Sequence, residues 1–166
     1  PAGGTDIVTY FSSTFYGCKV LQSVKNLDKF TNVSTFGSAF NDCEALQGVT
    51  LCPTGSSADA TNFSSAFWGC KALTSITNLD KFTKASNFAS AFRDCEALTD
   101  VTLPVPADPG KSISFNQTFN GCTALERIAN LDKYTKASNF SETFRNCTAL
   151  KDITLPVPAD ATKSIT

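Results

Sequence analysis

An apolar pattern, F-x3-F-x2-C-x2-L-x2-[V/I], occurs six times along the 166 residues of this chain. In the copy from Phe88 to Leu103, the two phenylalanines and the cysteine fall at positions i, i+4 and i+7, which is typical of one face of a short helix. The copy ends with apolar residues two apart, a spacing that indicates a strand. The cysteines of the six copies lie 25, 27, 25, 27 and 25 residues apart, at Cys18, Cys43, Cys70, Cys95, Cys122 and Cys147. This fixed period predicts a repeat architecture in which each unit buries its apolar face against its neighbours.

The units are of two alternating kinds. Odd units end in N-L-D-K-[F/Y]-T, whereas even units end in T-L-[C/P] and a connection rich in Pro, Gly, Ser and Ala, so the true repeat is a double unit of about 52 residues. We expect one repeat domain over residues 1–166, without evident capping units. Its units are expected at about 9–30, 34–55, 61–82, 86–107, 113–134 and 138–159.

Residues that flank the pattern favour a helix followed by a strand. The position two before the first Phe holds a good N-cap residue in five units: Thr9, Ser34, Thr61, Ser86 and Ser138. The residue before each cysteine is Gly, Asp or Asn, the types that tolerate the left-handed conformation at a helix end. Strands are expected at 47–51, 99–103 and 151–155 and at the equivalent places in odd units. Because these strands would run in the same direction, we expect one parallel sheet on one face of the solenoid and short helices on the other.

The combined motif resembles a known family. The stretches FGSAFNDCEAL (36–46) and NLDKFTNVSTF (26–36) are similar to the BspA-like leucine-rich repeats of bacterial surface proteins, and the similarity extends over nearly the whole chain. The resemblance implies an α/β fold, a right-handed leucine-rich-repeat solenoid of six units. It also implies a non-catalytic binding or adhesion module that is extracellular or attached to the cell surface and meets a protein partner or a cell-surface ligand.

The composition narrows the function further. The net charge is −1, so there is no basic excess for a nucleic-acid partner, and no apolar run reaches the ~18 residues of a membrane span. The chain has no histidine and no G-x-S-x-G or phosphate-binding loop, so we expect no enzyme activity, no metal and no cofactor. It begins at Pro1 and contains no methionine, which predicts a processed chain or a fragment.

The seven cysteines have several interpretations. The six repeated cysteines are predicted to be thiols stacked in the core, with disulfides along the stack or a zinc site as weaker alternatives. Cys52 replaces the proline found at positions 104 and 156 of the loop. We expect a partly exposed thiol there, with an intermolecular cross-link as the alternative.

Two surfaces are candidates for binding. The outward strand face carries a row of threonines, Thr50, Thr77, Thr102 and Thr154, which is either an ordinary solvent face or a flat ligand face. Tyr16 and Trp68 lie two residues before a repeated cysteine, with Lys19 and Lys71 nearby. They either pack over a neighbouring turn, or anchor a protein or a sugar, and the lysines would favour an acidic ligand.

The sequence is therefore compatible with three functions. A binding or adhesion module is the first. The second is a structural filament subunit that stacks head to tail, since the first and last units would expose apolar faces. The third is a glycan-binding accessory module built around Trp68.

Overall fold

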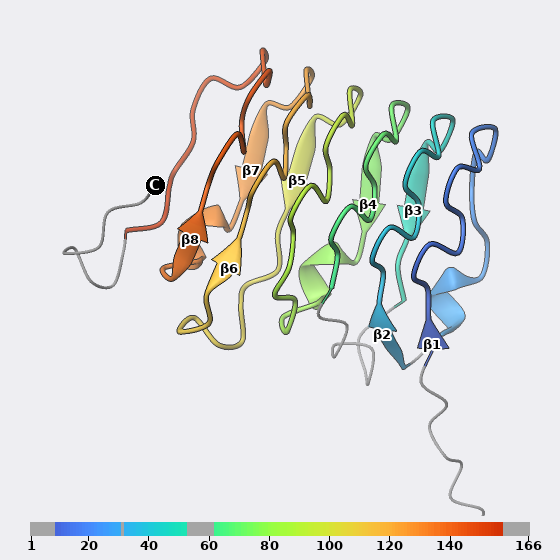
Figure 1. The fold of residues 1–166 in the computed structure, drawn as a ribbon, viewed down its shortest axis with the longest axis horizontal. Coiled ribbons are helices and arrows are strands. Elements are labelled where there is room, and N and C mark those ends of the chain that lie inside the picture. Colours follow the sequence, from blue (N-terminus) through green and yellow to red (C-terminus); the bar gives the residue numbers. More distant parts are fainter. Residues whose placement is uncertain (1–8, 31, 53–61, 158–166) are drawn as a thin grey trace, which may run out of the picture.

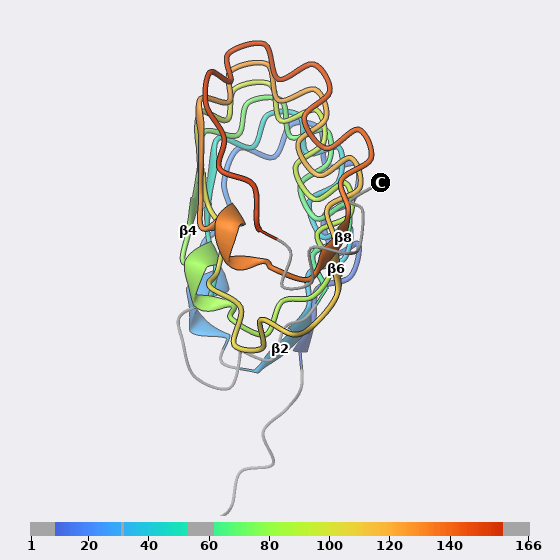
Figure 2. The ribbon, with the colours of Figure 1, turned by 90° about the vertical axis from the view of Figure 1, so that its left-hand side faces the viewer.

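The computed structural model describes residues 9–30, 32–52 and 62–157. Over these residues the chain winds into a solenoid in which successive copies of the motif lie beside one another (Figure 1). Viewed along the solenoid, the copies form stacked turns of an elongated ring (Figure 2). We call each copy of the motif a layer and count the layers in chain order, from the first, with Cys18, to the sixth, with Cys147.

Short parallel strands lie on one long side of the ring. β3 (Gly48–Thr50) pairs with β4 (Ser75–Thr77), and β5 (Asp100–Thr102) pairs with β7 (Arg127–Ala129). The prediction of parallel strands is confirmed, and β3 and β5 fall inside the predicted ranges 47–51 and 99–103. The prediction of one continuous sheet is wrong, because these strands form two separate pairs. Residues 151–155 are not a strand, since they form no ladder with β7 of the preceding layer.

The opposite long side carries a second parallel ladder that the sequence does not predict. β1 (Thr9–Tyr10) pairs with β2 (Val33–Thr35), and β6 (Ile113–Ser114) pairs with β8 (Ala137–Asn139). Single bridges through Asn62 and Asn87 connect β2 to β6. This side is therefore one ladder that runs along the whole described solenoid.

The predicted short helices are wrong for the described residues, which contain consecutive tight turns in their place. In the second layer, Ala39 N–H donates to Phe36 C=O at 2.9 Å, whereas Ser38 N–H donates to Ser64 C=O of the third layer, also at 2.9 Å. Successive backbone amides thus alternate between a hydrogen bond that closes a turn within the layer and a hydrogen bond to the next layer. Ser38 has φ of 54°, in the left-handed region, and such a residue interrupts a right-handed helix. The same left-handed position recurs in each layer, at Ser13, Ser38, Ser65, Ser90, Gln117 and Glu142.

The predicted N-cap residues therefore have another role. Thr9, Ser34 and Ser138 lie within strands β1, β2 and β8, Ser86 precedes the bridge residue Asn87, and Thr61 lies outside the described residues. The capping is done one residue later. There, a side-chain oxygen of Thr35, Asn62, Asn87, Ser114 or Asn139 accepts a hydrogen bond from the amide two residues on, at 2.8–3.3 Å. These side chains start the turns rather than a helix.

Three-residue 3₁₀ helices follow the odd layers: η1 (Leu27–Lys29), η3 (Leu79–Lys81) and η4 (Leu131–Lys133). Each begins after an asparagine in the left-handed conformation, with φ of 63–69°. The side-chain amides of Asn78 and Asn130 donate to the carbonyls of Leu51 and Leu103 in the preceding layer, at 3.0 and 2.8 Å. The N-L-D-K motif thus turns the chain and ties two layers together.

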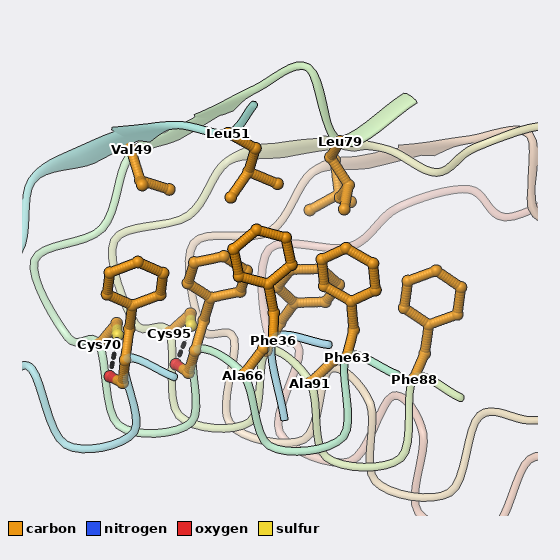
Figure 3. Packing of buried hydrophobic residues seen from close by; sticks show 14 of the residues in the cluster. Phe36, Val49, Leu51, Phe63, Ala66, Cys70, Leu79, Phe88, Ala91 and Cys95 are labelled. Carbon is orange, nitrogen blue, oxygen red and sulfur yellow. Dashed lines mark hydrogen bonds between the residues drawn. The ribbon is translucent and has the colours of Figure 1, made fainter. Parts of the chain in front are cut away.

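The core between the two sides is a stack of aromatic rings (Figure 3). The first phenylalanine of each layer stacks on its equivalents, with centroid spacings of 5.4–5.9 Å from Phe11 to Phe140. The second phenylalanines form a similar column from Phe15 to Phe144 at 5.2–6.2 Å. Phe82 meets the rings of Phe36 and Phe63 edge-on, and Tyr134 occupies the equivalent place two layers later. Aromatic pairs of this geometry each add about 0.5–1.5 kcal/mol beyond the burial of their area.

Candidate functional site

The repeated cysteines connect adjacent layers. The thiol of Cys95 donates to the carbonyl oxygen of Phe67 in the layer before it, at 3.0 Å (Figure 3). The thiols of Cys43, Cys70, Cys122 and Cys147 each donate to the equivalent carbonyl at 2.9–3.0 Å. Cys18, in the first layer, is exposed. Burial raises the pKa of Cys43 and of Cys147 to about 11, so these thiols stay protonated at neutral pH and are not poised as nucleophiles.

The expectation of a partly exposed thiol at Cys52 is wrong. Cys52 is fully buried, and the prolines at the equivalent positions 104 and 156 are buried as well. The position faces the interior of the solenoid. An intermolecular cross-link through Cys52 would therefore require the layer to open.

A row of equivalent side chains precedes the cysteines by two residues and runs along the bend that joins the two sides of the ring. We call it the ridge row: Tyr16, Asn41, Trp68, Arg93, Asn120 and Arg145. Its two asparagines are buried, whereas Tyr16 is 58% exposed and Arg145 is also exposed. Trp68 and Arg93 are partly exposed. The protruding members are therefore two aromatic residues and two arginines.

Trp68 is held in place by the fourth layer. Its indole Nε1–H donates to a carboxylate oxygen of Asp94 at 3.1 Å. The guanidinium carbon of Arg93 lies 4.7 Å from the centre of the indole ring, a cation–π contact. One face of the ring is thus covered by arginine. Trp68 therefore packs over its neighbour and also remains partly exposed, and its role as a binding anchor stays a prediction.

The polar contacts of the ridge row continue through the last three layers. Arg93 donates to the side-chain carbonyl of Gln117 at 2.9 Å, and the amide of Gln117 donates to Glu142 at 3.0 Å. Asn120 also donates to Glu142, at 3.1 Å, and Arg145 lies 3.4 Å from the same carboxylate. The hydrogen bond from Gln117, followed by the interaction with Arg145, lowers the pKa of Glu142. The chain of contacts orients both arginines of the ridge row.

The two predicted lysines are close to the ridge row but share one carboxylate. Lys19 lies 2.9 Å and Lys71 3.1 Å from Glu44, which belongs to the layer between them. The hydrogen bonds from both lysines lower the pKa of Glu44, and the bond to Glu44 raises the pKa of Lys19. With Glu44 included, the group carries one net positive charge instead of two. An acidic ligand would have to compete with Glu44 for these lysines.

The threonine row lies on a different part of the molecule. Thr50 and Thr77 are opposite each other in the β3–β4 pair, and Thr102 is opposite Ala129 in the β5–β7 pair; all three threonines are exposed. Thr154 is exposed as well but lies outside any strand. Beside the row, Arg127 is paired with Asp100 at 2.6 Å. The candidate residues thus form two separate surfaces. One is the ridge row with its lysines, and the other is the strand face.

Sequence reasoning missed Arg93, Asp94, Gln117, Glu142 and Arg145. The signal was available for the arginines, since they occupy the same place in the motif as Tyr16 and Trp68. A comparison restricted to the odd units does not include them, because Arg93 and Arg145 belong to even layers.

Other features of the described residues offer little chemistry. They contain no cluster of three or more His, Cys, Asp or Glu side chains able to hold a metal ion. Residues in the described ranges form no helix with the length and apolar character needed to cross a bilayer. A pocket of about 210 Å³ opens between the third and fourth connections, lined by Thr83, Lys84, Ala85, Pro106, Ala107, Asp108, Lys111 and Ile113. It contains no nucleophile with a paired base.

The fold and the repeated motif define a leucine-rich-repeat solenoid. The sequence profile of the BspA type leucine rich repeat region, present in six copies, matches residues 5–107 and 63–165, and the chain belongs to this family. Proteins of this family are typically bacterial and surface-associated, and their repeats are in general non-catalytic modules for protein interaction.

Two solved structures are similar to this chain. A leucine-rich repeat protein from Bacteroides ovatus shares 25% identity with a TM-score of 0.53, over 87% of this chain and 35% of that one. The Treponema pallidum leucine rich repeat protein shares 21% identity with a TM-score of 0.55, over 88% of this chain and 72% of that one, which supports the fold alone. This chain therefore spans about a third of the length of the Bacteroides protein. No curated protein matches it.

Proposed function

We propose that this chain is a non-catalytic binding module that contacts a protein partner at the cell surface through the ridge row. The observation that carries the proposal is the residue content of that row. Tyr16, Trp68, Arg93 and Arg145 belong to the three residue types most enriched at the energetic centres of protein interfaces. The row is also ordered before binding, since Trp68, Arg93 and Arg145 each have side-chain partners. Preordered side chains lose less conformational entropy when a partner arrives.

The other candidate surfaces fit a partner less well. The strand face offers short hydroxyl side chains and an internally paired Arg127 and Asp100. A glycan module built around Trp68 would need an open ring face, but Arg93 covers one face of the indole. The ridge row is therefore preferred over both the threonine row and a sugar site.

The proposal is tested by placing a photo-crosslinking amino acid at position 16 in one preparation and at position 102 in another. Each protein is exposed to cell-surface extract, and crosslinked products are identified by mass spectrometry. We expect a discrete product from position 16 that unlabelled wild type competes away, whereas a Tyr16→Ser/Arg145→Ser variant competes poorly. Both replaced side chains are exposed, so the fold should tolerate the change. Equal capture from position 102, or equal competition by the variant, would contradict the proposal.

A further inference from the structure

The pocket of about 210 Å³ lies between two connections of the solenoid, residues 83–85 and residues 106–113. Ala85 and Ile113 are the buried residues of its lining, and both are aliphatic, as is Pro106 beside them. A pocket for a drug-sized molecule has about 300–1,000 Å³, whereas a cavity of about 150 Å³ already holds benzene. This pocket therefore has room for about one amino-acid residue.

Hydrogen bonds hold the longer connection in place from both sides. The amide of Ala107 donates to the carbonyl of Thr83 in the preceding connection, at 2.8 Å. The hydroxyl of Thr135, in the following connection, donates to the carbonyl of Pro109 at 3.4 Å. The pocket is thus shaped before a ligand arrives, so little ordering is required on binding.

The charged residues of the lining are Lys84, Asp108 and Lys111, which together carry one net positive charge. A carboxylate oxygen of Asp108 accepts the amide of Gly110 at 2.8 Å, and its carbonyl accepts the amide of Lys111 at 3.2 Å. Asp108 therefore closes the turn that places Lys111 at the pocket. Lys84 has an interaction of its own, whereas no ion pair in the described part of the chain includes Lys111. Lys111 is thus the cation that an anionic ligand can pair with.

The sequence repeats the lining of this pocket once. Each of the eight lining residues has an identical counterpart 52 positions later, although the residues at positions 109 and 110 differ from those at 161 and 162. The first double unit has Asn32 and Asp59 at the places of the two lysines. The lysines are therefore not required to build a unit of this solenoid.

We propose that the pocket binds the last residue of a peptide chain that ends in a branched aliphatic side chain, such as valine. The terminal carboxylate pairs with the ammonium group of Lys111, and the aliphatic side chain packs against Ala85, Pro106 and Ile113. The pocket shares no residue with the ridge row, so its occupation does not depend on the function proposed above.

Two other occupants fit the pocket less well. A sugar ring stacks on aromatic side chains, and the lining contains none. A free small acid would fill only part of a space that has room for a whole residue. A peptide end also agrees with the general use of these repeats as modules for protein interaction.

Nuclear magnetic resonance of the ¹⁵N-labelled chain tests the proposal, with the peptide acetyl-Gly-Ala-Val as the probe. We expect saturable shifts of the backbone amides of Ala85, Ala107, Lys111 and Ile113. The same peptide with a C-terminal amide should bind at least about tenfold more weakly, because it lacks the negative charge. Isovalerate keeps the carboxylate and the branched group but has no peptide backbone, and it should also bind more weakly.

Two variants test the pocket itself. Lys111→Ala should weaken binding of the peptide about threefold to tenfold, because it removes the cation. Ala107→Leu should weaken it at least as much, because the larger side chain narrows the pocket; Ala107 is exposed, so the fold should tolerate the change. Because the shifts are read at each residue, the repeated residues at 135–165 do not mask either effect.

Matched controls replace exposed residues outside the pocket. Lys25→Ala and Thr102→Leu should bind the peptide like the wild type, and all four variants should keep its unfolding midpoint. The absence of saturable shifts at the pocket would overturn the proposal. So would equal binding of the amidated peptide or of isovalerate, or binding that both Lys111→Ala and Ala107→Leu leave unchanged.

Discussion

The thiol of Cys95 donates a hydrogen bond to the carbonyl oxygen of Phe67 across 3.0 Å, from one layer to the layer before it. The same carbonyl also accepts the amide of Cys70 at 3.1 Å, which closes a turn within its own layer. The carbonyl oxygen of Phe67 thus accepts one hydrogen bond that closes a turn and another that joins two layers. Cysteine suits this place because its side chain is small and apolar enough for the core and still carries a weak donor.

We predict that Cys95→Ala lowers the free energy of unfolding by about 1–3 kcal/mol, because it removes the interlayer bond and leaves a small cavity. Denaturation in urea, followed by circular dichroism in dilute solution, measures the change. Cys18→Ala is the matched control, since Cys18 is exposed, and it should cost less than about 0.5 kcal/mol. Equal losses from the two variants would show that the interlayer bond contributes little.

We predict that the protein loses stability as the pH rises from about 9 to about 11. Burial raises the pKa of Cys43 and Cys147 to about 11, from an ordinary value of 9.0 in the unfolded chain. Between these pH values the unfolded thiols release protons that the folded thiols retain, so ionisation favours unfolding. The stabilising contribution is complete below pH 9.0 and disappears as the pH passes the folded pKa.

Urea titrations at several pH values measure this dependence. A Cys43→Ala variant should show a shallower decline than the wild type over the same interval, because it has one thiol fewer to ionise. A decline of unchanged steepness would assign the pH effect to other groups.

The asparagine that precedes η4 separates two contributions to stability. Asn130 combines a φ of 67° with a side-chain hydrogen bond to Leu103 C=O at 2.8 Å. Asn130→Gly keeps the backbone relaxed and loses the bond, so we expect a cost of about 1 kcal/mol. Asn130→Ala should cost about 1–2 kcal/mol more, because alanine is strained in this conformation. Thermal and urea unfolding of the two variants measure the difference, and equal losses would contradict this division.

Tyr134 replaces the phenylalanines that stand at the equivalent positions 30 and 82. Its buried hydroxyl donates to the carbonyl of Pro104 at 2.7 Å. We expect Tyr134→Phe to lower the free energy of unfolding by about 1–2 kcal/mol, since the carbonyl loses its partner. Tyr10→Phe serves as the control, because Tyr10 is 68% exposed, and should leave the urea midpoint unchanged. If Tyr134→Phe leaves the free energy of unfolding unchanged, the hydroxyl forms an equally good hydrogen bond with water in the unfolded chain.

The sequence pattern predicted the repeat, its two alternating kinds of unit, the parallel strands and the family, because each depends on spacing that recurs six times. It failed at the segment between the two phenylalanines. A spacing of four fits a helix as well as two tight turns, and nothing local marks Ser38 or Ser90 as left-handed. The sequence identified only part of the candidate site. Tyr16 and Trp68 could be predicted because they are large aromatic residues outside the repeated pattern, whereas Arg93 and Arg145 could not be told from other charged surface residues.

The sequence by itself determined which residues lie inward, since an apolar side chain repeated at one position has to meet its own copies. Tertiary structure alone decided where the backbone amides go. In an isolated layer each amide could close a helical turn, but beside another layer it finds a carbonyl at hydrogen-bond distance. Stacking therefore replaces the predicted helices with tight turns, in which alternate amides donate to the next layer. It also brings Arg93 over Trp68 and Asp42 against Gly69, contacts between residues about 25 positions apart that no local pattern contains.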